Sequence, residues 1–333
     1  MCHDIQRRDV LKFTVAGLAL VPCSVRAQQA GKVSRVALVF GGVAGDPDLD
    51  ARILAIQSQM IPLGWIDGQN IRYDVYYAQN NPERARAIAH QILAATPDVI
   101  LSAGTIPTMA LHAVIRRIPI VFVNVTDPVA GGFVTSLARP GGNITGFTPF
   151  EYPIAGKWLS LLRELAPDMT RVALLGGPLN HNFKGFWAEF EPAARKAGLE
   201  PVKSPAGDAA EIERNLRAFS SEPKGGLVIS AAQFSLTNRD LITGLAAQLK
   251  LPTIYWSRFF PKFGGLISYG PNIDKLHGRS ATYIDRILRG EKPESLPVQE
   301  PVDFETVLNA KTARALGLTI STTLLAQADE VIE

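Results

Sequence analysis

The sequence predicts an α/β protein built from two doubly wound, parallel-sheet lobes that are joined by a hinge. Two observations support this prediction: short apolar runs alternate with amphipathic helical segments, and this alternation restarts halfway along the chain. Strands that alternate with helices are typical of a parallel sheet covered on both faces. The length of 333 residues is enough for two ordinary domains.

The first half contains four apolar runs that we interpret as strands. They lie at residues 35–40, 71–77, 99–102 and 120–124. Helices are expected between them, at 49–63, around 85–93 with one apolar face, and as a short helix after Pro107. These elements form the first predicted α/β unit.

The second half repeats the start of the first. Residues 171–174 read Arg-Val-Ala-Leu, as do residues 35–38, and a Gly-Gly pair soon follows each of these runs. Further strands are expected at Pro201 and at 227–230. One helix should begin at Asp208, with Glu211 as its capping pair, and another at Leu236. The repeat predicts a second lobe.

Three segments marked by glycine and proline are candidates for crossings between the lobes, at 139–149, 268–271 and 293–301. The helix between the last two carries an apolar stripe, from Ile273 to Leu288, and should pack back onto the first lobe. We therefore expect one lobe of residues 33–145 with 271–300, and another of 146–270 with 301–333. Hinge motion is absorbed at such glycines and element ends.

Residues 1–27 have the layout of a signal peptide for twin-arginine export. Arg7-Arg8 is followed by an apolar stretch at 13–21, and Val25-Arg26-Ala27 suits cleavage after Ala27. This layout predicts a periplasmic protein. Two alternatives are a lipoprotein anchored through Cys23, although Pro22 fits that reading poorly, and a short amphipathic N-terminal helix.

The composition excludes several classes of function. Four basic and two acidic residues in the signal segment supply +2 of the formal charge of +3, so the remaining chain gives no support to nucleic-acid binding. Both cysteines, Cys2 and Cys23, lie in that segment, which excludes disulfides and thiolate metal sites from the mature protein. The sequence contains no run of eighteen apolar residues, which is the length that would predict a membrane span.

Known catalytic and cofactor motifs are missing. The sequence contains no G-x-S-x-G, P-loop, H-E-x-x-H or C-x-x-C motif, and the glycines after the first strand do not fit the dinucleotide fingerprint. We therefore expect no enzyme activity, no metal and no cofactor. An exported enzyme would have only Thr126 and Asp127 as a candidate pair, and these neighbours are poorly placed to face each other.

Ligands of open α/β sheets bind in loops at the carboxyl ends of the strands. Gly104 and Thr105 start a helix there and can hold an anion. Asp127 can pair with an ammonium group or start a turn, Asn180 can bind or cap a helix, and the aromatic residues can stack on a ligand or pack in the core. The predicted ligand-binding residues are Gly42, Gly104, Thr105, Asn124, Thr126, Asp127, Asn180, Gln233, Tyr255, Trp256 and Tyr269.

Several longer motifs carry a family resemblance over nearly the whole chain. They are Leu-Gly-Trp-Ile-Asp-Gly-Gln-Asn at 63–70, Ile-Pro-Ile-Val-Phe-Val at 118–123, Thr-Asp-Pro-Val at 126–129, Arg-Pro-Gly-Gly-Asn-Ile-Thr-Gly at 139–146, Ser-Tyr-Gly at 268–270, Ile-Leu-Arg-Gly-Glu-Lys-Pro at 287–293 and Lys-Thr-Ala-Arg-Ala-Leu-Gly-Leu at 311–318. With them the chain resembles the ABC-transporter substrate-binding proteins of the tryptophan/tyrosine type, which have the class I periplasmic binding protein fold.

The resemblance implies a monomeric receptor that captures a small polar organic solute between its lobes and delivers it to the permease of an ABC importer. One departure bears on the ligand: segment 231–235 lacks the acidic residue that many binding proteins place there for an α-ammonium group. An amino-acid-like ligand is one expectation, and this departure together with the extra glycine of loop 41–46 counts against it. A sensory ligand-binding domain of the same fold is the alternative function.

Overall fold

The computed structural model describes residues 33–177 and 181–333. The predicted signal peptide and Asn180 therefore lie outside the described residues. Within the described ranges, no helix has the length and apolar character needed to cross a membrane.

The first sheet has five parallel strands in the order β2-β1-β3-β4-β5. They are β1 (Ser34–Phe40), β2 (Ile71–Tyr77), β3 (Val99–Ala103), β4 (Ile120–Val123) and β5 (Ile144–Phe147). The helices packed on this sheet are α1 (Pro47–Met60), α2 (Pro82–Ala95), α3 (Thr105–Val114) and α10 (Ile273–Leu288). Short 3-10 helices lie at Ile61–Leu63 (η1) and Pro293–Ser295 (η2).

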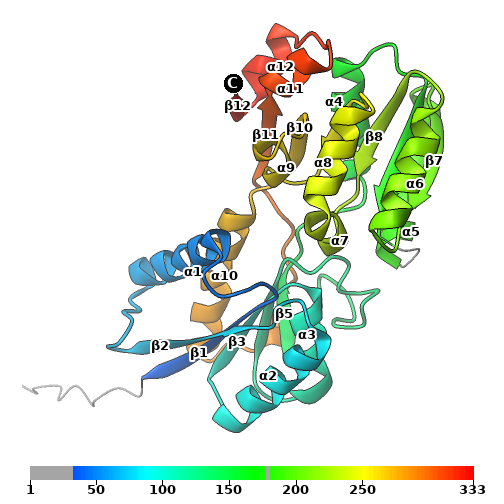
Figure 1. Cartoon of the computed structure of the whole chain (residues 1–333). Coiled ribbons are helices and arrows are strands. Elements are labelled where there is room, and N and C mark those ends of the chain that lie inside the picture. Colours follow the sequence, from blue (N-terminus) through cyan, green and yellow to red (C-terminus); the bar gives the residue numbers. More distant parts are fainter. Residues whose placement is uncertain (1–32, 178–180) are drawn as a thin grey trace, which may run out of the picture. The chain divides into compact units, whose positions relative to one another are not determined.

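Both faces of β1, β3 and β4 are buried, which explains why these strands are largely apolar. The edge strand β2 is only half-buried and carries Arg72 and Asp74. Val36 and Leu38 on one face of β1 join a core with α1 and α10, whereas Ala37 and Val39 join a core with α2 and α3. Figure 1 shows α1 and α10 lying side by side along this sheet. The late helix α10 thus packs on the first sheet, as its apolar stripe predicted.

The second sheet has seven strands in the order β12-β11-β10-β9-β8-β6-β7. They are β6 (Arg171–Gly176), β7 (Glu200–Pro205), β8 (Gly225–Ile229), β9 (Thr253–Tyr255), β10 (Ile267–Pro271), β11 (Phe304–Asn309) and β12 (Glu330–Ile332). Its helices are α4 (Ile154–Leu165), α5 (His181–Lys196), α6 (Ala209–Ser220), α7 (Gln233–Thr237), α8 (Arg239–Gln248), α9 (Phe259–Lys262), α11 (Ala310–Ala315) and α12 (Thr322–Gln327). The prediction of two α/β parallel-sheet lobes is confirmed.

One pair of strands in the second sheet is antiparallel. The chain leaves β10 at Pro271 and re-enters the sheet at Phe304, and these two residues are paired in the register of β10 with β11. Because the chain leaves and re-enters the sheet at the same end of these strands, β11 runs antiparallel to β10. The other strand pairs of both sheets are parallel.

Local sequence signals set several helix starts. Asp46 caps α1 by accepting from Asp48 N at 3.0 Å. At α6, Asp208 accepts from Glu211 N at 2.8 Å while Glu211 accepts from Gly207 N at 2.7 Å, so the predicted capping pair is confirmed. The helix predicted from Leu236 is instead two helices, α7 and α8. They are divided at Asn238, whose side chain donates to Phe234 O at 2.9 Å and competes with helical bonding.

The chain crosses between the two sheets after β5, after β10 and again before β11. In the third crossing, Gln299 N donates to Gly146 O at 2.9 Å, and Gln299 O accepts from Thr148 N at 2.9 Å. Asn272 N of the second crossing donates to Asp303 O at 2.9 Å. The third crossing is therefore bonded to both others. Since β5 runs to Phe147, the first sheet extends two residues past the boundary expected at 145.

Gly270, just before the second crossing, has no room for a side chain. A Cβ there would lie 1.8 Å from the backbone oxygen of Trp256. We expect Gly270→Ala to lower the free energy of unfolding by about 1–3 kcal/mol in urea denaturation, the usual cost of forcing extra atoms into a packed site. Gly244→Ala in α8 is the matched control, because a Cβ there would meet open space. Since alanine suits a helix interior better than glycine, this variant should raise the free energy of unfolding by about 0.5–1 kcal/mol. Unchanged stability of Gly270→Ala would contradict this packing.

Candidate functional site

The candidate site is a cavity of about 480 Å³ that both sheets line. It receives the loops after β1, β3 and β4 from the first sheet, and those after β6, β8 and β9 from the second. The carboxyl ends of parallel strands therefore converge on it, as they do at ligand sites of open α/β sheets. This volume is within the usual range for small-molecule pockets.

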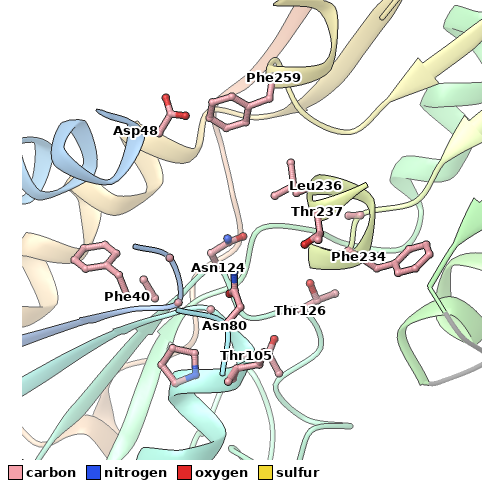
Figure 2. A pocket seen from close by; sticks show the side chains of 18 of the residues that line it. Phe40, Asp48, Asn80, Thr105, Asn124, Thr126, Phe234, Leu236, Thr237 and Phe259 are labelled. Carbon is pink, nitrogen blue, oxygen red and sulfur yellow. The ribbon is translucent and has the colours of Figure 1, made fainter. Parts of the chain in front are cut away.

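The first sheet supplies mostly polar groups. Gly104, with φ 97°, leads into α3, whose N-terminus has no side-chain cap, and Thr105 is the exposed first residue of that helix. Asn80 and Asn124 have left-handed backbones, with φ of 52° and 61°, which amide residues tolerate. Figure 2 shows Asn80, Thr105, Asn124 and Thr126 gathered on this side of the cavity.

The second sheet supplies an aromatic and apolar wall. Phe234 and Leu236 come from α7, and Figure 2 shows α7 across the cavity from Thr126. Trp256 is buried, with its Nε1 donating to Ser235 Oγ at 3.0 Å, and its ring meets the Phe150 ring edge-on at 5.4 Å between centroids. A flat apolar molecule can pack against such a wall.

One amide on this side has a free acceptor. Asn182 Nδ2 donates to Ala231 O at 2.9 Å, which fixes the side chain beside the loop after β8. Its Oδ1 is buried and has no hydrogen-bond partner in the part of the chain that the structure describes. Asn182 thus brings an unsatisfied acceptor to the lining of the cavity.

The charges around the cavity are balanced among its described residues, with Asp46 and Asp48 against Arg52 and Arg239. Burial raises the pKa of Asp48, and the nearby Arg52 partly opposes that shift. The guanidinium of Arg52 lies 5.9 Å from the centre of the Phe259 ring, so a residue of α1 contacts a residue of α9. The site can thus accept a zwitterion or a neutral molecule.

His277 of α10 is among the residues that line the cavity and is only 1% exposed. Its Nδ1 is 2.7 Å from Ile273 O, and its ring stacks on Phe40 with centroids 6.2 Å apart. Burial, helped by the charge of Arg52, lowers the pKa of His277 to about 3. His277 is therefore a neutral imidazole at physiological pH.

Six of the predicted ligand-binding residues line this cavity. They are Gly42, Gly104, Thr105, Asn124, Thr126 and Trp256. Gln233 is the first residue of α7, the helix that contributes Phe234 and Leu236. What these residues bind stays a prediction.

Three of the predicted residues do not line the cavity. Asp127 starts a turn: its Oδ1 accepts from Ala130 N at 2.9 Å and its Oδ2 accepts from Tyr152 OH at 3.0 Å. It lines a separate cavity of about 300 Å³, so the turn interpretation describes it better than an ammonium partner in the main cavity. Tyr255 is a core residue stacked on Phe260, and Tyr269 stacks on Phe304 outside the cavity.

Sequence reasoning missed several residues of the cavity wall. Asn80 could have been found, because it follows β2 and the rule of strand ends applies to it equally. Arg52 and His277 carried no such signal, since they come from helices that are distant in sequence and adjacent only in the fold.

Comparisons with known proteins identify relatives of this chain. Residues 42–332 match the sequence profile of the family described as ABC transporter substrate binding protein. A tyrosine-binding protein of Clostridioides difficile (strain R20291) is 25% identical over 278 residues, which cover 82% of this chain and 78% of that protein.

Two solved structures have the same fold. A conserved domain protein from Vibrio cholerae is 27% identical with a TM-score of 0.81, covering 90% of this chain and all of that chain. A Streptococcus domain solved in complex with L-Trp is 23% identical with a TM-score of 0.81, covering 90% of this chain and 99% of that one. The fold is that of a class I periplasmic binding protein.

The buried, neutral state of His277 predicts how stability depends on pH. The unfolded chain binds a proton at this histidine below its ordinary pKa of 6.5, whereas the folded protein does not do so until about pH 3. Acidification from 6.5 to 5 should therefore lower the free energy of unfolding by about 2 kcal/mol through this site alone.

Urea denaturation of His277→Gln at pH 7 and pH 5 measures this contribution. The variant should lose less stability on acidification than the wild type. His90→Gln is the control, because His90 lies exposed on α2 and its removal should leave the difference unchanged. An equal loss in the wild type and His277→Gln would show that His277 is not held neutral.

Proposed function

This chain belongs to the ABC transporter substrate-binding proteins, and on that premise we propose that its solute is a small organic acid with a flat apolar body. It captures this solute outside the cytoplasm and passes it to the membrane permease of an ABC importer. We further propose that capture takes place in the periplasm, after export by the signal of residues 1–27, and that the protein acts as a monomer.

The start of α3 is the proposed anchor for the acid group. The helix has ten residues, its N-terminus has no side-chain cap, and its backbone N–H groups and dipole favour an anion. The Thr105 hydroxyl stands at this helix start, with Asn124 and Thr126 from the next loop nearby. This convergence of polar groups opposite an apolar wall is the observation that carries the proposal.

The opposite wall supports the apolar body of the ligand. Phe150, Phe234, Leu236 and Trp256 line the cavity on this side. Tyrosine and L-Trp, the ligands named for two of the relatives, combine a carboxylate with an aromatic ring. Aromatic amino acids are therefore the first candidates here, with Asp46 and Asp48 as the negative charges available to an ammonium group.

The alternatives considered from the sequence receive no support from the relatives, which favour neither a sensory domain nor an exported enzyme. Thr126 and Asp127, the one pair considered for catalysis, line two different cavities. Within residues 33–177 and 181–333, no group of three His, Cys, Asp or Glu side chains is placed to hold a metal ion.

Thermal-shift screening against aromatic amino acids and other small acids tests the proposal, because a ligand that binds only the folded state raises its melting temperature. With the best ligand, Thr105→Ala should weaken binding by about 1–3 kcal/mol in calorimetry, the usual size for losing a hydrogen bond to a charged group. Thr282→Ala, on the exposed face of α10 outside the cavity, is the matched control and should bind normally. Unchanged affinity of Thr105→Ala would remove this residue from the site.

A further inference from the structure

The polar end of the cavity, formed by the loops after β2, β3 and β4, has no charged side chain among the residues that the structure describes. These loops contribute Asn80, residues 103–107, Asn124 and Thr126 to the lining, and all of them are neutral. Figure 2 shows Asn80, Thr105, Asn124 and Thr126 gathered at this end. The proposed acid anchor at the start of α3 is therefore surrounded by amides and hydroxyls.

The one carboxylate next to these residues in the sequence is used elsewhere. Asp127 directly follows Thr126, but its Oδ1 accepts from Ala130 N at 2.9 Å and its Oδ2 accepts from Tyr152 OH at 3.0 Å. It lines the separate, smaller cavity and not the main one. Asp127 is therefore not a counter-charge for a ligand held at the polar end.

The acidic residues that do line the main cavity belong to the start of α1. Asp46 caps this helix by accepting from Asp48 N at 3.0 Å. Figure 2 shows Asp48 beside Phe259 and apart from the neutral side chains of the polar end. From the loop after β8, the cavity receives Ala231 and Ala232, which also carry no charge. An ammonium group at the polar end would lack a carboxylate partner within the described chain.

Asn80 and Asn124 are instead available to a second polar group of the ligand. No hydrogen bond involving either side-chain amide occurs within residues 33–177 and 181–333. A Cβ on Gly41 would lie 3.0 Å from Asn80 Oδ1 and 3.8 Å from Ala103 O, so this oxygen stands close to the loop that leads into α3. A primary amide both donates and accepts hydrogen bonds, and it has no charge.

A hydroxyl group suits these surroundings better than an ammonium group does. Taking a charge out of water costs free energy unless an opposite charge compensates for it. The positive end of the α3 dipole raises that cost for a cation. A hydroxyl group exchanges hydrogen bonds with an amide and carries no such cost.

On the basis of the proposed function, we infer that the preferred solutes are aromatic 2-hydroxy acids. Their carboxylate binds at the start of α3, and their hydroxyl group hydrogen-bonds with one of the two amides, Asn80 or Asn124. Aromatic amino acids keep the ring and the carboxylate, so they bind as well, but more weakly. The neutral amides thus set the selectivity between two classes of acid.

Calorimetry with phenyllactate, phenylalanine and 3-phenylpropanoate tests this inference, because these acids share a ring and a carboxylate and differ in one group. Phenyllactate has a hydroxyl group where phenylalanine has an ammonium group and 3-phenylpropanoate has neither. We expect phenyllactate to bind about tenfold more tightly than either of the others, the usual effect of one net hydrogen bond.

Two variants place a carboxylate of nearly the same shape at the polar end. They are Asn80→Asp and Asn124→Asp, and aspartate tolerates the left-handed backbone that both positions have. At least one of them should raise the affinity for phenylalanine about tenfold, by supplying the missing charge partner, and reverse the preference.

Asn81→Asp is the matched control. Asn81 does not line the cavity and caps α2 by accepting from Arg84 N at 2.8 Å, a role that aspartate fills equally well. This variant adds the same charge one residue away from Asn80, and it should keep the preference of the wild type for phenyllactate.

The possible failures separate this inference from the proposed function. Phenylalanine that binds as tightly as phenyllactate, or more tightly, would overturn the inference and leave the acid anchor in place. Equal binding of phenyllactate and 3-phenylpropanoate would show that no hydroxyl group is recognised. A preference that stays unchanged in both aspartate variants would remove the two amides from the site. Binding of none of the three acids would overturn the proposed function, and the inference with it.

Discussion

The direction of the parallel strands is the constraint on which the site depends. The strands of the first sheet, and β6 to β10 of the second, point their carboxyl ends the same way within each sheet. The loops after β1, β3, β4, β6, β8 and β9 all reach one cavity. Each loop needs only a short polar or aromatic segment to contribute to it. The first sheet contributes amides, hydroxyls and a helix N-terminus, and the second contributes rings. The division explains how a ligand with a polar and an apolar part can bind both sheets at once.

The three crossings between the sheets are hydrogen-bonded to one another and to a loop that reaches the cavity. Gln299 pairs with the backbone on both sides of Phe147, and Asn272 bonds through its backbone to Asp303 and through its side chain to Glu305 at 2.8 Å. Arg258, from the loop after β9, also donates to Glu305 at 3.0 Å. The hinge proposed for this chain therefore consists of backbone segments that are hydrogen-bonded to one another. The Glu305 carboxylate links Asn272 of the second crossing to Arg258, in the loop that begins with Trp256.

The fold was largely readable from the sequence because it follows from patterns that are local. The sequence pattern predicted four of the five strands of the first sheet to within one residue, and Asp208 with Glu211 predicted a helix start. The fifth strand, β5, was expected only as part of a crossing. The strand-end rule found Thr105 and Asn124, but it also selected Tyr255, whose ring turns into the core, and Asp127, whose carboxylate closes a turn. Side-chain direction at a strand end depends on packing. Arg52 and His277 were out of reach because they stand within helices α1 and α10, which only the fold brings to the cavity.

The central claim is that one ligand binds groups from both sheets and thereby favours a closed state of the two lobes, by its differential affinity for that state. Solution X-ray scattering of the protein with and without a saturating ligand tests this claim most directly. We expect a smaller radius of gyration with ligand, accompanied by a change in tryptophan fluorescence that Trp256→Phe largely removes. A tight ligand that leaves the scattering curve unchanged would contradict the clamp and indicate a preformed pocket instead.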